Sequence, residues 1–526
     1  MTASLLGSLR WGCIGLMVSL TAAGCGGNPS IAGGPIGTKA GPGTKPAEKP
    51  KDGVKTTVTA KAAPAGGGAK SVVIPATGWQ VPVDVANSGS PSRADWLNLG
   101  WDTFVALSWP AQPQGIPGQP NQGVSITDPK AAVGPTVWST YLSKQQLFQP
   151  MGADPGTWAQ PTLDPETQNG LPVLDGFSKV APDKFEDEFN EAFSSAPLID
   201  TQQNYVLYEI RLNQAEFAYV VVNQYYDADK QIASFTPPIS FVGFPKTGQD
   251  ITYPTTKLPV TLPPWAQQGA LEVKASWRML TMTDDASRYY TQKSYYKSPD
   301  GTVQGPVLLG LVGLHILRLT PTTGSTWYWA TFEQVDNLGE SGHTASFSSS
   351  KLPDPTAAGY SYKPAEIQSG QPLPPAPTPV NVKRVFPIAN DVQAANQAYQ
   401  AALKGTVWQY YQLIDVQNPV PKGTPGAAPV PLSPNPDKAP NSGPTVFSGS
   451  FANTGQLANV TMETYQQLDP SITGTPPQSC VNCHGQFGYP QGAPQTSDYQ
   501  IFTFLLGDAT SSTMPKQPKQ PKKPKK

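Results

Sequence analysis

The sequence predicts an α+β fold in which helices pack against an antiparallel sheet. The run 271–279 alternates apolar and polar residues without a break, which is the pattern of a strand with one buried face. The run 94–109 instead places its apolar residues at helical spacing and stops before Pro110. Strand-like and helix-like runs do not alternate as they do in a doubly wound sheet, so we expect α+β rather than α/β.

Two more helices are expected in the body of the chain. One begins at Pro182 and carries phenylalanines at every fourth position on a single stripe. The other, over 390–403, is rich in alanine and is capped by Asn390 or Asp391, with Gly405 near its end.

Three further strands complete the predicted sheet. An apolar strand over 307–319 turns at 320–325 and returns as 326–332, and another strand over 407–416 is rich in Trp and Tyr. Proline-rich stretches read as long surface loops between the ordered elements. They lie near 111–136, 149–173, 252–265, 351–379 and 417–446.

The composition is that of a globular protein with a small net charge. Charged residues make up 14% and aromatic residues 10% of the 526 residues, and the formal net charge is −1. The aromatic content predicts a packed core. The absence of a basic excess argues against nucleic-acid binding.

The most specific motif is the pentapeptide Cys480-Val481-Asn482-Cys483-His484. Two thiols three residues apart lie on one face of a helical turn, where each can add to one vinyl group of the same porphyrin. The histidine follows directly, so its imidazole can reach the iron as the proximal ligand. We therefore expect one covalent haem c, bound through Cys480 and Cys483, with His484 on the iron.

Two other chemistries use paired cysteines. A zinc site needs a second Cys or His pair at ligand spacing, which the sequence does not contain. A redox dithiol needs a preceding strand in a βαβ unit, whereas the run 471–477 before the motif reads as a loop. The motif resembles that of the c-type cytochromes, and the resemblance covers little else in the chain. It implies covalent haem and one-electron transfer outside the cytoplasm.

The sequence leaves the sixth iron ligand open. Few residues follow His484, so a protein ligand should come from upstream, and Met462, in a predicted helix start, is the first candidate. Met279 or a histidine are alternatives, as is an iron that is open or water-bound. His315 reads as a core histidine on the apolar face of its strand, and His343 as a surface residue. The choice matters because methionine raises the potential, whereas an open site permits ligand binding or peroxide chemistry.

The N-terminus has the layout of an export signal. Arg10 precedes an apolar run, 11–20, that is too short to span a bilayer. The small residues before Cys25 resemble the bacterial lipobox, which implies that Cys25 carries a lipid; an ordinary signal with a chance cysteine is the alternative. Gly26 after that cysteine, in place of aspartate, favours the outer membrane.

The chain is expected to have five segments. They are a lipoprotein-type signal peptide (1–24), a disordered tether rich in Gly, Pro, Lys and Ala (25–75), an α+β body (76–446), a short helical haem-binding segment (447–510) and a disordered basic tail (511–526). Because Cys13 lies in the signal, no cysteine remains for a disulfide.

These observations predict an exported, membrane-tethered monohaem cytochrome in the periplasm or cell envelope that exchanges electrons with redox partner proteins. The sequence has no Gly-x-Ser-x-Gly, phosphate-loop or His-Glu-x-x-His motif, which favours an electron carrier over an enzyme. The alternatives are a peroxidase- or oxidase-like haem enzyme and a redox- or gas-sensing lipoprotein with an open iron site. The runs 101–107 and 329–333 are similar to uncharacterised bacterial proteins that end in one haem motif, which implies no substrate.

Overall fold

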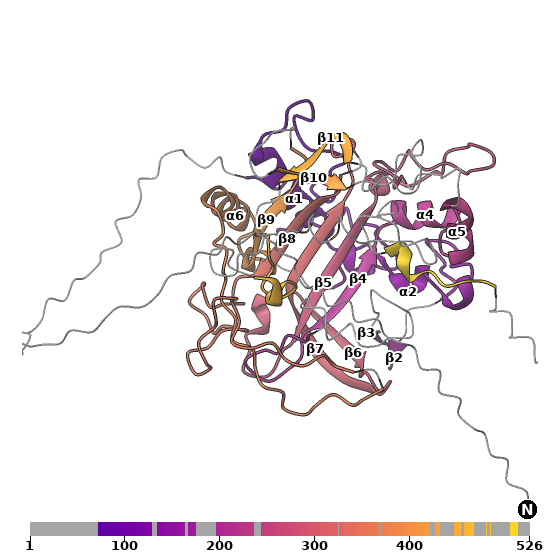
Figure 1. Cartoon of the computed structure of the whole chain (residues 1–526). Helices are drawn as coiled ribbons and strands as arrows, with labels where there is room; N and C mark the ends of the chain where they lie inside the picture. Colours follow the sequence, from indigo (N-terminus) through magenta and orange to yellow (C-terminus); the bar gives the residue numbers. More distant parts are fainter. Residues whose placement is uncertain are drawn as a thin grey trace, which may run out of the picture. The chain divides into compact units, whose positions relative to one another are not determined.

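The long strand β7 (Val303–Arg318) is the central strand of the main sheet (Figure 1). β5 (Leu271–Met279) pairs with it on one side, antiparallel along the whole length of β5. On the other side, the first half of β7 pairs with β6 (Thr291–Lys297) and the second half with β8 (Tyr328–Gln334). The sheet therefore forks along β7, and β9 (Tyr411–Gln417) extends the branch that β8 begins.

The structure is a computed structural model. It describes residues 72–128, 134–163, 167–174, 196–235, 243–324, 326–368, 370–420, 427–431, 446–453, 457–467, 480, 484 and 505–513. All of these fall within one unit, Gly67–Lys526. The predicted signal peptide and almost all of the tether, the helix expected from Pro182, Cys25, Cys483 and most of the basic tail lie outside the described residues.

The remaining described strands make the sheet mixed. They are β1 (Leu142–Ser143), β2 (Thr167–Gln168), β3 (Leu171–Leu174) and β4 (Leu207–Leu212), with a separate hairpin of β10 (Ala427–Pro431) and β11 (Val446–Asn453). β4 and β1 follow β5 outward, and β3 and β2 follow β6. β3 runs parallel to β6, and the other described pairs are antiparallel. The predicted α+β class is confirmed, but the expectation of a wholly antiparallel sheet is wrong at β3, where the long connection through β4 and β5 permits a parallel pair.

The predicted strand 271–279 is β5, but both of its faces are covered rather than one. Every residue is buried except Lys274 and the last. On the polar side, the Ser276 hydroxyl oxygen lies 2.7 Å from that of Thr461, and Arg278 pairs with Asp200 at 2.7 Å. The alternating pattern therefore predicts correctly which side chains share a face of β5. It predicts wrongly that the polar face is exposed to solvent, because distant segments cover that face.

α1 (Arg93–Leu107) confirms the helix predicted at 94–109. Its N-terminus is a capping box: the Ser92 hydroxyl accepts from the Asp95 amide at 3.2 Å, and the Asp95 carboxylate accepts from the Ser92 amide at 2.8 Å. Its apolar face packs on β8, where the rings of Phe104 and Phe332 stack with centroids 4.3 Å apart.

The helix predicted at 390–403 is α6 (Asn390–Ala402), which packs against β9 and α1 (Figure 1). The predicted cap is wrong. Ala389 holds the N-cap position without a side-chain hydrogen bond, and the carboxylate of Asp391 instead accepts from Arg93 Nε at 3.1 Å.

The strands predicted at 307–319 and 326–332 are confirmed as β7 and β8. The strand predicted at 407–416 begins later, as β9, because Val407–Tyr410 form a 3₁₀ turn. The Thr406 hydroxyl caps that turn by accepting from the Trp408 amide at 3.2 Å.

The other described α-helices are short. They are α2 (Lys144–Leu147), α4 (Gln214–Val222) and α5 (Ala228–Phe235). Over the described parts of the chain, no helix combines the length and the apolar character that crossing a bilayer requires.

Candidate functional site

A segment that we call the strap, residues 457–467, crosses the face of the sheet opposite to α1. The Asn459 side-chain amide donates to Thr331 Oγ1 of β8 at 2.9 Å, and the Thr461 hydroxyl meets that of Ser276 of β5. Successive side chains of a strand point to opposite faces, and the residue next to Thr331 packs on α1. The strap and α1 therefore cover opposite faces of one sheet.

The strap and the chain end share the hydrophobic core of the body. Their buried core members are Leu457, Ala458, Val460, Met462, Tyr465, Leu505, Leu506 and Ala509. All but the first two belong to the same cluster as α1 and the sheet. A buried ion pair, Lys144 Nζ to Asp508 Oδ2 at 3.0 Å, also ties the chain end to α2. Most of the strap and residues 505–509, which lie in the predicted segment 447–510, thus pack into the core of the predicted body 76–446.

Two residues of the pentapeptide, Cys480 and His484, are described, and both are helical and half-buried. Residues four apart in a helix lie on the same face, one turn above the other. Cys480 packs against the hydrophobic core and is in no disulfide. The two described residues of the motif are therefore helical, and the residues between them lie outside the described part of the chain.

The imidazole of His484 lies against Trp329 of β8. Their ring centroids are 5.1 Å apart with the planes at 61°, an edge-to-face contact. Trp329 is 3% exposed, so the histidine contacts a buried aromatic side chain. Sequence reasoning did not pair these two residues, because no spacing rule connects a strand residue with a motif so far along the chain.

Met462, the first candidate for a sixth ligand, is 1% exposed, and it is a residue of the strap that belongs to the hydrophobic core. The helix start predicted around it is wrong: the chain makes a turn, closed by a hydrogen bond from the Met462 amide to the Asn459 carbonyl oxygen at 3.1 Å, and then the 3₁₀ turn Thr464–Gln466. The turn replaces a helix because the buried Asn459 side chain binds the sheet and the next turn at once. Its role as a ligand stays a prediction.

His315 is a buried, paired histidine, as expected. Its Nε2 lies 2.8 Å from Glu463 Oε1 of the strap, while its Nδ1 is buried without a hydrogen-bond partner. Burial opposes ionisation of Glu463, but the charge and hydrogen bond of His315 and the Asn459 amide outweigh it and lower the pKa of that carboxyl. His343 is exposed, also as expected. His315 thus anchors the strap to β7.

Two other carboxyls meet where β5 begins. Glu216 of α4 is fully buried beside Glu272 of β5. Burial, and then the neighbouring charge of Glu272, raise the pKa of Glu216 well above its ordinary value. Glu216 therefore holds a proton more readily than a solvent-exposed glutamate does.

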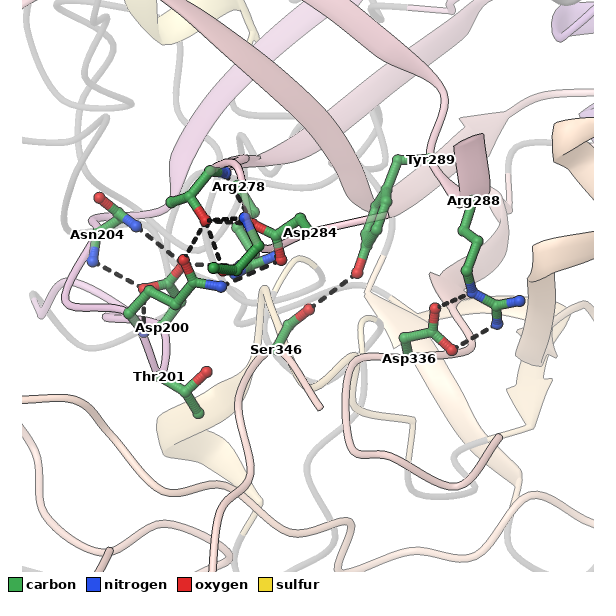
Figure 2. Close-up of polar contacts among 12 residues, drawn as sticks. Asp200, Thr201, Asn204, Arg278, Asp284, Arg288, Tyr289, Asp336 and Ser346 are labelled. Atoms are coloured by element: carbon green, nitrogen blue, oxygen red, sulfur yellow. Dashed lines mark hydrogen bonds and ion pairs between the residues drawn. The ribbon is translucent and has the colours of Figure 1, made fainter. Parts of the chain in front are cut away.

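At the opposite end of β5, buried ion pairs hold the loops together (Figure 2). Arg278 donates to Asp200 and to Asp284, each at 2.7 Å. Arg288 binds Asp336 through two bonds of 2.6 and 2.7 Å. These guanidinium groups are satisfied by carboxylates, so the network reads as structural support for the loops rather than as a reactive centre.

The residues described at the motif fit the chemistry of covalent haem. The Cys480 thiol, which is in no disulfide, and the His484 imidazole are both on helical residues, and Trp329 is an apolar neighbour of the imidazole. Within the described ranges, no three side chains of His, Cys, Asp or Glu gather around a point that could hold a metal ion. Comparisons with protein-family models, with curated proteins and with solved structures find no match to the chain.

Proposed function

We propose that this chain is an exported, membrane-tethered monohaem c-type cytochrome that passes single electrons between redox partner proteins. The observation that carries the proposal is the pentapeptide at 480–484. It is supported by the helical setting of its first and last residues and by the contact between His484 and the buried Trp329. The α+β body would hold the haem segment and offer the partners a surface.

Each residue of the motif has a distinct role in this proposal. Cys480 and Cys483 hold the porphyrin through thioether bonds, and His484 ligates the iron. Haem c, when bound, supplies a one-electron iron couple. Cys480 is half-buried against the core and His484 against Trp329, so the chain shields one side of the motif from water.

The sixth ligand decides between electron transfer and the alternative activities. Met462 is the proposed distal ligand, because a thioether in a dry core keeps a high potential. In that case the reduced spectrum is low-spin, and the methionine-to-iron charge-transfer band disappears in Met462→Ala. A high-spin ferric spectrum with rapid cyanide or carbon monoxide binding would instead indicate the haem enzyme or the sensing lipoprotein.

The location follows from the ends of the chain. Cys25 would carry the lipid, and the tether up to residue 75 would let the folded part stand off the membrane by roughly 40 Å, the root-mean-square reach of about 50 flexible residues. In this arrangement the haem would lie in the periplasm, and Gly26 in place of aspartate after Cys25 favours the outer membrane. The basic tail would keep the chain soluble, and electrostatic docking to an acidic partner or surface is the alternative.

A pyridine haemochrome assay tests the proposal. The full chain is exported in a host that matures c-type cytochromes and is purified alongside the Cys480→Ala/Cys483→Ala variant. We expect one haem per wild-type chain that survives denaturing electrophoresis and none on the variant. Colourless wild-type protein with both thiols free to react would refute the proposal.

A further inference from the structure

Trp329 holds a fixed place beside the imidazole of His484. It lies within β8, directly across from Leu317 of β7 on one side and Gln417 of β9 on the other. The exposed fractions are 3% for Trp329, 6% for Leu317 and 1% for Gln417. An indole packed between two neighbouring strands at this density has little room to turn.

The His484 side chain is half-buried, and an imidazole rotates about its Cβ–Cγ bond in a broad energy well. The edge-to-face contact with Trp329, with centroids 5.1 Å apart, is the arrangement that aromatic pairs prefer. A rigid ring in that position selects one orientation of the imidazole plane.

We propose that Trp329 is the positioning residue of the haem site: it fixes the plane of the His484 imidazole and keeps water from its flank. The inference rests on the proposed function. The orientation of an axial ligand and the dryness of its surroundings are two means by which a protein tunes an iron centre. A dry flank disfavours the more highly charged ferric state, so Trp329 raises the reduction potential.

The contact itself is testable without haem. The chain has three histidines, so ¹³C-histidine labelling of the full-length chain, expressed without attachment machinery, gives three ring signals. His315→Gln and His343→Gln assign two of them. In Trp329→Leu we expect the His484 signal alone to shift, because it loses the ring current of the indole. Trp329→Phe keeps an aromatic ring and should restore most of the original position.

Trp327→Leu is the matched control. Trp327 is also 3% exposed and makes its edge contact with Phe244, at 5.6 Å. This variant removes the same volume directly before β8 begins. We expect it to leave the His484 signal in place, which separates the ring contact from a general loosening of β8.

The potential of the haem-loaded chain completes the test. In Trp329→Leu we expect unchanged haem content and a three- to tenfold weaker preference for the ferrous state. At ~59 mV per tenfold for one electron, this lowers the potential by about 30–60 mV. Trp329→Phe and Trp327→Leu should stay near the wild-type value. An unchanged His484 signal in haem-free Trp329→Leu, together with an unchanged potential in the haem-loaded variant, overturns the inference alone. Wild-type chain without haem overturns the proposed function, and the inference with it.

Discussion

Asn459 is the side chain on which the attachment of the strap depends. It is fully buried and makes four hydrogen bonds: its amide donates to Thr331 Oγ1 and to the Phe332 carbonyl oxygen, each at 2.9 Å, and its Oδ1 accepts from the amide (2.9 Å) and hydroxyl (2.8 Å) of Thr461. At about 1 kcal/mol net for each bond, Asn459→Ala should lower the free energy of unfolding by about 4 kcal/mol. Urea unfolding, followed by circular dichroism, measures the loss.

A matched variant shows whether the loss is local to the strap. Asn381 is 3% exposed, and its side chain makes three bonds, two to backbone oxygens and one from the Ser349 amide. Asn381→Ala should therefore cost about 3 kcal/mol without freeing the strap. Hydrogen exchange should accelerate in residues 457–467 only in Asn459→Ala. A loss below about 1 kcal/mol, or equal exchange in both variants, would contradict the reasoning, because four satisfied buried bonds cannot be removed so cheaply.

Three further changes have defined outcomes. Burial and Glu272 raise the pKa of Glu216 in the folded state, so the free energy of unfolding should fall as pH rises above the unfolded pKa of 4.5. Glu216→Gln should remove this pH dependence. Urea unfolding curves from pH ~5 to ~8 should therefore show the variant becoming increasingly more stable than the wild type. In Gly313→Ala, the new methyl group would overlap the Thr461 hydroxyl and lie 2.5 Å from the Ser276 hydroxyl oxygen, which should cost about 1–3 kcal/mol in urea unfolding; a neutral result would place the strap elsewhere. Because the proposed lipid is attached to Cys25, Cys25→Ala should move the chain from the membrane to the soluble fraction and abolish labelling with radioactive palmitate.

The parts of the fold that local pattern determines could be predicted. α1, β5, β7 and β8 each carry their own periodicity, and the structure places them within a few residues of the predicted bounds. What failed depended on partners far away in sequence. The alternating polar residues of β5 predicted a solvent-exposed face, but Thr461, 185 residues later in the sequence, covers Ser276. No local pattern could show that Asp391 binds Arg93 instead of capping α6.

In the candidate site too, local features could be predicted from the sequence, and features that depend on distant partners could not. The spacing of two thiols and an imidazole is local chemistry, and it was sufficient to single out residues 480–484. The contact between Trp329 and His484 depends on the register of β8 within the sheet. No single stretch of the sequence determines that register. The strap around Met462 was equally hidden, because its buried groups find their partners on β5, β7 and β8.

The strap comes late in a chain that is made from its N-terminus onward. By the time residue 334 has emerged, β5, β7 and β8 are complete, but Ser276, His315 and Thr331 still lack the partners that bury them. The body can close this side only after residue 467 has followed, within 20 residues of the pentapeptide 480–484. The strap and the residues proposed to bind haem are therefore synthesised one after the other. A chain truncated before residue 457 leaves the polar side chains of Ser276, His315 and Thr331 exposed to water, which distinguishes it from the complete protein.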